Sequence, residues 1–279
     1  MKKRILSLVL ICLLVLSSLS LAFADDKTTT ITIIHTNDTH GRILGDSTSI
    51  GFPKIATIVK ETKAANPNTL VLDAGDTLHG MPIVNISKGE NAIKVLEATG
   101  YDYMTIGNHD FNYGQERLLE LRDMTSVGMI SANILDENGN NLFTPYVIKE
   151  IDGVKVGIFG LSTPETAYKT SPSNVTGLTF ANPIETAEKI VNEIKDQTDV
   201  IIGIVHLGLD GGSEFTSERL ANEVDGIDVL IDGHSHTLLE NGLLVNGTLI
   251  AQTFEHDKNI GKVTIEVSNG EVISKTAEL

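Results

Sequence analysis

The hydrophobic pattern alternates between two kinds of segment along most of the chain. Short runs of β-branched and other apolar residues predict buried strands at residues 31–34, 69–72, 104–106, 154–159, 200–205 and 229–231. Between these runs, apolar residues at helical spacing predict helices at residues 54–63, 92–98, 116–124, 184–195 and 217–223. This alternation is typical of an α/β fold.

Two features argue against a single parallel sheet. Residues 146–156 read as a hairpin that turns at Asp152-Gly153. The segment from Leu243 to Ala277 is nearly all strand and turn. We therefore expect two packed sheets with helices outside them.

Residues 1–24 have the pattern of a secretory signal peptide. A basic start is followed by an apolar run from Ile5 to Leu16 and by Ala22-Phe23-Ala24, which reads as a cleavage site. A retained membrane anchor is the weaker alternative, because the apolar core is shorter than the roughly 20 residues that span a bilayer. We expect one mature domain at 25–279 that is secreted, periplasmic or at the cell surface, without a stable membrane anchor.

The composition of the mature chain limits its partners. Cys12 is the only cysteine and lies in the predicted signal, so no disulfide is expected. Without the signal, 18 basic residues face 37 acidic ones, a net charge of −19. This disfavours nucleic-acid polymers, which bind to basic faces. A small phosphorylated substrate fits if metal ions supply local positive charge. Nothing in the sequence indicates an oligomeric state.

Carboxylate, amide and imidazole side chains follow five of the predicted strands. Open α/β sheets bind ligands at the carboxyl ends of their strands, so we expect these side chains to meet. Each segment alone is a weak signal, because Asp-Gly is usually a turn and a lone histidine is usually a packed or surface residue. Together they supply more ligands than one ion can use. The segments are 37–41, 73–80, 107–110, 206–208 and 232–236.

The chemistry of these side chains favours a pair of divalent metal ions. Oxygen and imidazole ligands without thiolate suit Zn, Mn, Fe or Co. Two such ions about 3.5–4 Å apart hold the attacking and leaving oxygens of a phosphoryl transfer and generate hydroxide near neutral pH. The sequence therefore predicts a dinuclear site that acts on phosphoesters.

Five ordered motifs resemble those of the calcineurin-like binuclear metallophosphoesterases. Within that family, the likeness is to the secreted 5'-nucleotidases and 2',3'-cyclic-nucleotide phosphodiesterases. The resemblance covers nearly the whole mature chain and implies a four-layered α/β/β/α sandwich of two mixed sheets flanked by helices. The motifs are His35–Gly41 (HTNDTHG), Gly75–Thr77 (GDT), Gly107–Phe111 (GNHDF), His206–Gly208 (HLG) and Gly233–His236 (GHSH).

The resemblance also implies a role for each polar residue of these motifs. The metal ligands it implies are Asp38, His40 and His236 for one ion, Asn108, His206 and His234 for the other, and Asp76 as the bridge between them. His109 is expected to contact the phosphate and to stabilise or protonate the departing oxygen, and Asn108 is expected to lie beside the substrate as well. The implied nucleophile is a metal-bound hydroxide, so no covalent intermediate with the enzyme is needed.

Asn112 departs from the pattern of the 5'-nucleotidases. Members that act on 5'-nucleotides commonly carry Asp three residues after the histidine, where it orients the imidazole and stabilises its charge. Asn lacks that charge, and at this place it resembles the cyclic-nucleotide phosphodiesterases. We include Asn112 among the candidate catalytic residues. The adjacent Asp110 is not expected to replace the missing carboxylate.

Three other histidines carry less specific predictions. His35 is expected to be packed beside the site. His79 either faces the site from its loop or does not, and the sequence leaves both readings open. His256 is expected to be an ordinary turn residue in the β-rich tail.

The larger nucleotidases of this family have a second domain that stacks the base on aromatic side chains. Trp is absent and aromatic residues make up 5% of this chain, so no stacking platform is visible. We expect an exported hydrolase of nucleotide phosphomonoesters or 2',3'-cyclic nucleotides. The alternatives are a catalytically weak metal- or nucleotide-binding protein on the same scaffold, or a fragment without its substrate-binding domain. Substrate choice is expected to depend on loops 44–52 and 168–177.

Overall fold

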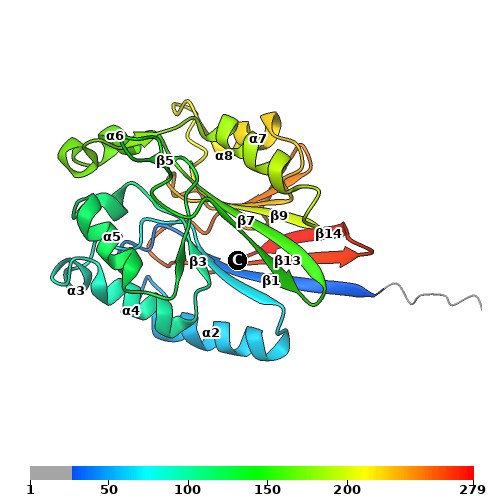
Figure 1. Cartoon of the computed structure of the whole chain (residues 1–279). Helices are drawn as coiled ribbons and strands as arrows, with labels where there is room; N and C mark the ends of the chain where they lie inside the picture. The colour runs from blue at the N-terminus through cyan, green and yellow to red at the C-terminus, as the bar shows by residue number, and fades with distance from the viewer. Residues whose placement is uncertain (1–26) are drawn as a thin grey trace, which may run out of the picture.

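The computed structural model describes residues 27–279 and consists of four layers (Figure 1). Two six-stranded sheets pack against each other, and helices cover the outer face of each sheet. This arrangement confirms the α/β/β/α sandwich expected from the sequence. The predicted signal peptide at 1–24 lies outside the described residues. Within 27–279, no helix is long and apolar enough to cross a membrane.

The first sheet has the strand order β14-β13-β1-β2-β3-β4. Its four parallel strands are β1 (Thr28–Thr36), β2 (Thr69–Asp73), β3 (Tyr103–Met104) and β4 (Gly128–Met129). The antiparallel strands at the other edge are β13 (Gly261–Ser268) and β14 (Glu271–Glu278). The helices on this side are α2 (Phe52–Ala65), α3 (Pro82–Asn85), α4 (Glu90–Thr99) and α5 (Gln115–Asp123).

The second sheet has the strand order β11-β12-β10-β9-β7-β6. Its four parallel strands are β7 (Val154–Ser162), β9 (Val200–His206), β10 (Val229–Ile231) and β12 (Thr248–Ala251). Its antiparallel edges are β6 (Tyr146–Ile151) and β11 (Leu243–Val245). The helices on this side are α6 (Thr166–Lys169), α7 (Pro183–Ile194) and α8 (Ser217–Glu223). Smaller elements are β5 (Ile134–Leu135), β8 (Thr179–Phe180) and the 3-10 turns η1 (His109–Phe111) and η2 (Pro172–Val175).

The core fills three interfaces between the four layers. Successive side chains of a strand point to opposite faces of its sheet. In β1, Ile31 and Ile33 pack between the two sheets, whereas Ile34 packs on the side of the helices. A third cluster lies between the second sheet and its helices and includes Ile190 of α7 and Leu220 of α8. Because both faces of each central strand are covered, these strands read as continuous apolar runs.

The hairpin expected across Asp152-Gly153 is confirmed by the pairing of β6 with β7. Both turn residues have positive φ, 51° and 87°, as a tight hairpin turn requires. The strands expected between Leu243 and Ala277 are confirmed as β11 to β14. The strand predicted at 104–106 has different bounds in the structure, where β3 ends at Met104. Thr105 follows the strand, and its hydroxyl donates to the carbonyl of Ile130 at 3.1 Å.

Candidate metal centre

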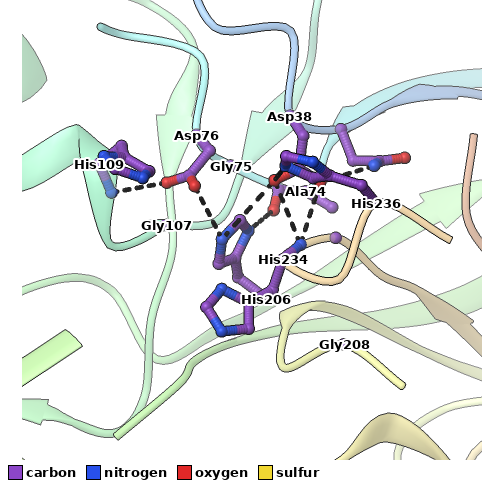
Figure 2. A network of polar contacts seen from close by, with 12 residues as sticks. Asp38, Ala74, Gly75, Asp76, Gly107, His109, His206, Gly208, His234 and His236 are labelled. Atoms are coloured by element: carbon purple, nitrogen blue, oxygen red, sulfur yellow. Dashed lines mark hydrogen bonds and ion pairs between the residues drawn. The ribbon is translucent and has the colours of Figure 1, made fainter. Parts of the chain in front are cut away.

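The five segments predicted to meet do converge at one edge of the sandwich. They are the loops that follow β1, β2, β3, β9 and β10. Figure 2 shows the side chains of Asp38, Asp76, His206 and His236 directed toward one another. Strands that run parallel end at the same edge of their sheet, which explains how residues so far apart in sequence come together.

Two overlapping groups of side chains could each hold a metal ion. In the first group, Asp38, His40 and His236 place one ligand atom each within 4.8 Å of the others. The His236 Nε2 atom lies 3.4 Å from Asp38 Oδ1 and 3.4 Å from His40 Nε2. Three ligand atoms at this spacing suit one divalent ion.

The second group lies beside the first and shares Asp38 with it. It comprises Asp38, Asp76 and His206, all of them buried. His206 Nε2 lies 3.3 Å from Asp76 Oδ2 and 3.9 Å from Asp38 Oδ1. The ring of His234 lies 5.1 Å from the ring of His206, centroid to centroid. The predicted ligands therefore lie together on both sides of the two aspartates.

Unpartnered polar atoms test whether these residues fit metal ions. Among the described residues, six buried side-chain atoms have no hydrogen-bond partner, and two of them, Asn108 Oδ1 and His206 Nε2, belong to predicted ligands. Buried polar atoms are nearly always satisfied, so two such atoms on predicted ligands fit coordination of an ion. One of these atoms is an amide oxygen and the other an imidazole nitrogen, and divalent ions bind both kinds of atom. The residues present therefore fit two divalent metal ions.

Electrostatics at this place favour positive charge. Burial lowers the pKa of His206, but Asp76 and Asp38 outweigh it and raise this pKa to about 10. Without metal, the proton on His206 balances the buried carboxylates. Burial also lowers the pKa of His40, to about 4, in spite of the same two aspartates. A neutral imidazole is the form that binds metal.

The backbone of the ligand residues is strained. Twelve described non-glycine residues have positive φ, and five of them are predicted ligands. L-residues adopt this left-handed conformation rarely, and it persists where the surroundings enforce it, commonly at functional sites. The five are Asp38 (48°), His40 (47°), Asp76 (57°), His234 (76°) and His236 (50°).

Two buried aspartates hold the ligand loops together through backbone amides. Asp110 accepts hydrogen bonds from the amides of Asp76, Thr77, Leu78 and Gly107, at 2.8–3.0 Å. Asp232 accepts from the amides of Leu207, Gly208 and Gly233, at 2.8–3.1 Å. Asp110 thus fixes the loops after β2 and β3, and its carboxylate is engaged by the backbone. It does not replace the carboxylate missing at Asn112.

His109 lies beside Asp76 and contacts Asn112. The His109 amide donates to Asp76 Oδ1 at 2.7 Å, and Asn112 Nδ2 lies 3.0 Å from His109 Nδ1 (Figure 2 shows the first of these contacts). The hydroxyl of Thr170 donates to Asn112 Oδ1 at 3.1 Å, so the amide oxygen faces away from the ring. An NH2 group can only donate, so His109 Nδ1 accepts and the ring proton is held at Nε2.

The structure also places the three other histidines, His35, His79 and His256. His35 is buried and packed against Gly261, as expected. The ring of His79 lies 6.1 Å from that of His109 and nearly parallel to it, so it does border the site. The ring of His256 lies 5.4 Å from that of His40. His256 lies in a turn, as expected, and the loop after β12 that contains it folds back toward the first group of ligands.

Two glutamates that sequence reasoning missed contact the ligand histidines. Glu165 Oε2 lies 3.0 Å from His234 Nε2, and Glu255 Oε2 lies 2.8 Å from His236 Nδ1. Burial would raise the pKa of Glu165, but hydrogen bonds from His234 and Lys169 lower it to about 2. Both glutamates follow strands of the second sheet, β7 and β12. Their place beyond the carboxyl ends of strands agrees with the general position of ligand sites, but a single glutamate in a loop is too common to be singled out from the sequence.

Comparison with known proteins places the chain in a family. Residues 31–238 match the calcineurin-like phosphoesterases. The 5'-nucleotidase of Vibrio cholerae is 32% identical over 279 residues, which cover 88% of this chain and 50% of that protein. A trifunctional nucleotide phosphoesterase of Bacillus subtilis, YfkN, is 31% identical over 84% of this chain and 18% of its own length. This chain spans about half the length of the 5'-nucleotidases it matches.

Solved structures agree with the sequence comparison. A 5'-nucleotidase precursor from Thermus thermophilus superposes with a TM-score of 0.79 at 27% identity, over 90% of this chain and 54% of that one. The family match spans most of the chain and includes every segment that supplies a predicted ligand. The chain therefore belongs to the calcineurin-like phosphoesterase family.

Proposed function

We propose that this protein is a metal-dependent hydrolase of nucleotide phosphoesters, acting on 5'-monophosphates or 2',3'-cyclic phosphates at a dinuclear site. The observation that carries the proposal is the convergence of the ligand side chains around two buried, unpartnered ligand atoms, Asn108 Oδ1 and His206 Nε2. A purely structural role for so many buried polar groups would be unfavourable without metal.

In this proposal seven residues would hold two divalent ions. Asp76 would contribute to both positions, and bound ions would supply positive charge to the phosphate and lower the pKa of a bound water. Asp38, His40 and His236 form one position, and Asn108, His206 and His234 form the other. The neutral amide of Asn108 leaves more positive charge for the phosphate than a further carboxylate would.

His109 serves the departing oxygen. Its backbone amide is fixed to Asp76 at 2.7 Å, which directs the ring to the edge of the metal centre. The donation from Asn112 to Nδ1 holds the ring proton at Nε2, where it would stabilise the charge that develops on the leaving group. Asn108, the preceding residue, lies beside the same phosphate.

The names of the relatives support a nucleotide as substrate. The curated matches include 5'-nucleotidases and a nucleotide phosphoesterase, and a solved match is an NAD nucleotidase from Haemophilus influenzae. An acidic protein can still bind a small anionic substrate, because the metal ions would supply positive charge at the site. The sequence pattern at 1–24 supports a protein that acts outside the cytoplasm.

Asn112 favours one alternative, a catalytically weak protein that binds metal and nucleotide on this scaffold. An amide donor at His109 Nδ1 cannot stabilise an imidazolium by charge, which limits proton donation. Both the hydrolase and the weak binding protein would bind metal, but only the hydrolase would turn over its substrate.

Hydrolysis of a matched pair of substrates by the Mn-loaded protein tests the proposal. One is a 5'-mononucleotide, the other a 2',3'-cyclic mononucleotide, with the Asn108→Ala/His109→Ala variant as control. Cleavage of either substrate by the wild type but not by the variant supports the proposed hydrolase. The preferred substrate then distinguishes a 5'-nucleotidase from a cyclic-nucleotide phosphodiesterase. Two bound metals per chain with no cleavage of either would favour the weak binding protein.

A further inference from the structure

Three of the predicted ligand histidines lie at or just beyond the carboxyl ends of strands of the second sheet. In each of them, one ring nitrogen contacts an oxygen acceptor, which leaves the other nitrogen for the metal. His206 Nδ1 lies 2.6 Å from the carbonyl oxygen of Ala74. For the other two the acceptor is a carboxylate, Glu165 for His234 and Glu255 for His236. These carboxylates come from loops that contribute no predicted metal ligand.

The contact with Glu255 determines which nitrogen of His236 faces the metal. His236 Nδ1 donates to Glu255 Oε2 at 2.8 Å, so Nε2 carries the free lone pair. That nitrogen lies 3.4 Å from Asp38 Oδ1, inside the first group of ligands. The ring of His236 is about one third exposed, so little packing restrains it and the carboxylate is its main anchor.

Glu165 contacts His234, a predicted ligand of the other metal position, and it does so through Nε2 rather than Nδ1. His234 Nε2 lies 3.0 Å from Glu165 Oε2, which leaves Nδ1 for the metal. The side chain of His234 is almost fully buried and that of Glu165 is 15% exposed, so this contact is shielded from water. Hydrogen bonds of this kind are stronger than exposed ones.

Each of these glutamates also has a lysine partner close in sequence. Lys169 Nζ lies 3.0 Å from Glu165 Oε2, and Lys258 Nζ lies 2.8 Å from Glu255 Oε1. The lysine holds the carboxylate in place while its contact with the imidazole is kept. A histidine, a glutamate and a lysine therefore lie together at each metal position, and at His234 the lysine also comes within 3.3 Å of the imidazole Nε2.

We propose that Glu165 and Glu255 are positioning residues of the metal centre, each of which fixes the tautomer and orientation of one histidine ligand at one metal position. The inference rests on the proposed function only in taking the site to be dinuclear. Carboxylates that hold a ligand histidine typically change metal affinity 10–100-fold when removed. Removing each glutamate should weaken one ion and leave the other nearly unchanged.

The test measures Mn²⁺ binding, which does not depend on turnover. Free Mn²⁺ is counted by electron paramagnetic resonance while the metal-free protein is titrated. In Glu255→Ala, one of two dissociation constants is expected to rise about 10–100-fold. In Glu165→Ala, the other constant should rise by a similar factor. Glu278→Ala, which removes an exposed pair with Lys262, is the matched control and should change neither.

A double-mutant cycle separates positioning from general structure. Glu255→Ala should have no further effect on Mn²⁺ binding in a His236→Ala background, because the two residues act as one unit. The effects of Glu165→Ala and Glu255→Ala should add, since they concern different ions. Glu255→Gln, which keeps an acceptor for Nδ1, should restore most of the affinity.

Three results would overturn the proposal. One is unchanged Mn²⁺ binding in both alanine variants. Another is an equal loss at both ions together with a lower unfolding temperature of the metal-free variants, which would indicate a structural role. The last is a full effect of Glu255→Ala when His236 is already absent. If the cycle succeeds while no nucleotide is cleaved, the positioning role stands and the proposed hydrolase fails.

Discussion

The amide nitrogen of Asn112 lies 3.0 Å from Nδ1 of His109, and the hydroxyl of Thr170 holds the amide oxygen away from the ring. This relationship makes His109 Nδ1 an acceptor and leaves Nε2 as the donor. It differs from the arrangement in which a carboxylate faces Nδ1 and stabilises the cationic ring.

Replacement of Asn112 by Asp should favour 5'-nucleotides. Asp would accept from Nδ1 and stabilise a second ring proton, which promotes protonation of the leaving group. We expect the ratio of kcat for a 5'-mononucleotide to kcat for a 2',3'-cyclic mononucleotide to rise about tenfold. Steady-state kinetics on both substrates measure it. An unchanged ratio in Asn112→Asp would show that the residue does not act through His109.

Thr170 should influence turnover although it does not touch His109. Its hydroxyl fixes the direction of the Asn112 amide, so Thr170→Val should reduce kcat roughly threefold, the effect of about one weak hydrogen bond. Thr170→Ser keeps the donor and serves as the matched control. The two variants should have equal KM values. Equal kcat values in the two would argue against the role of Thr170.

Gly107 should be essential for metal binding because of the space it leaves. A Cβ atom added at Gly107 would lie 2.2 Å from Oδ1 of Asp76, the carboxylate proposed to contribute to both metal positions. Gly107→Ala should displace Asp76 and abolish tight binding of at least one Mn²⁺ ion. Gly211→Ala, where a Cβ meets nothing within 4 Å, is the control. Retention of two ions with unchanged affinity in Gly107→Ala would contradict the assigned role of Asp76.

Stability of the metal-free protein should depend on pH through Asp73. Burial raises the pKa of Asp73 to about 7, above the usual 3.8 of an unfolded chain, although Thr36 and Thr77 donate to it. The folded state therefore binds the proton more tightly, and this contribution to stability falls as pH rises from about 4 to 7. Chemical unfolding at pH 5 and pH 8 in EDTA measures the change. Asp73→Asn should lose less stability than the wild type over this interval, and an identical loss would refute the assignment.

The sequence indicated the fold and most of the site for a physical reason. Strands buried on both faces stand out as apolar runs, and the polar residues just beyond their ends must meet at one edge. The positions of Asp76 and His206 could thus be related although they are 130 positions apart in the sequence.

The residues that sequence reasoning missed lack such a signal. Glu165 and Glu255 are single glutamates in loops, a common surface residue, and only their contacts with His234 and His236 distinguish them. The direction of the Asn112 amide depends on Thr170, which is distant in sequence. The position of His256 over His40 depends on how the loop after β12 folds back, and apolar periodicity does not describe loops.

The central claim is that two metal ions held by this chain cleave a nucleotide phosphoester. The most direct measurement is to titrate the metal-free protein with Mn²⁺ while following hydrolysis of the 5'-mononucleotide and the 2',3'-cyclic mononucleotide. We predict that turnover of at least one substrate appears with the second bound ion and disappears on addition of EDTA. Full turnover in EDTA, or two bound ions with neither substrate cleaved, would contradict the claim.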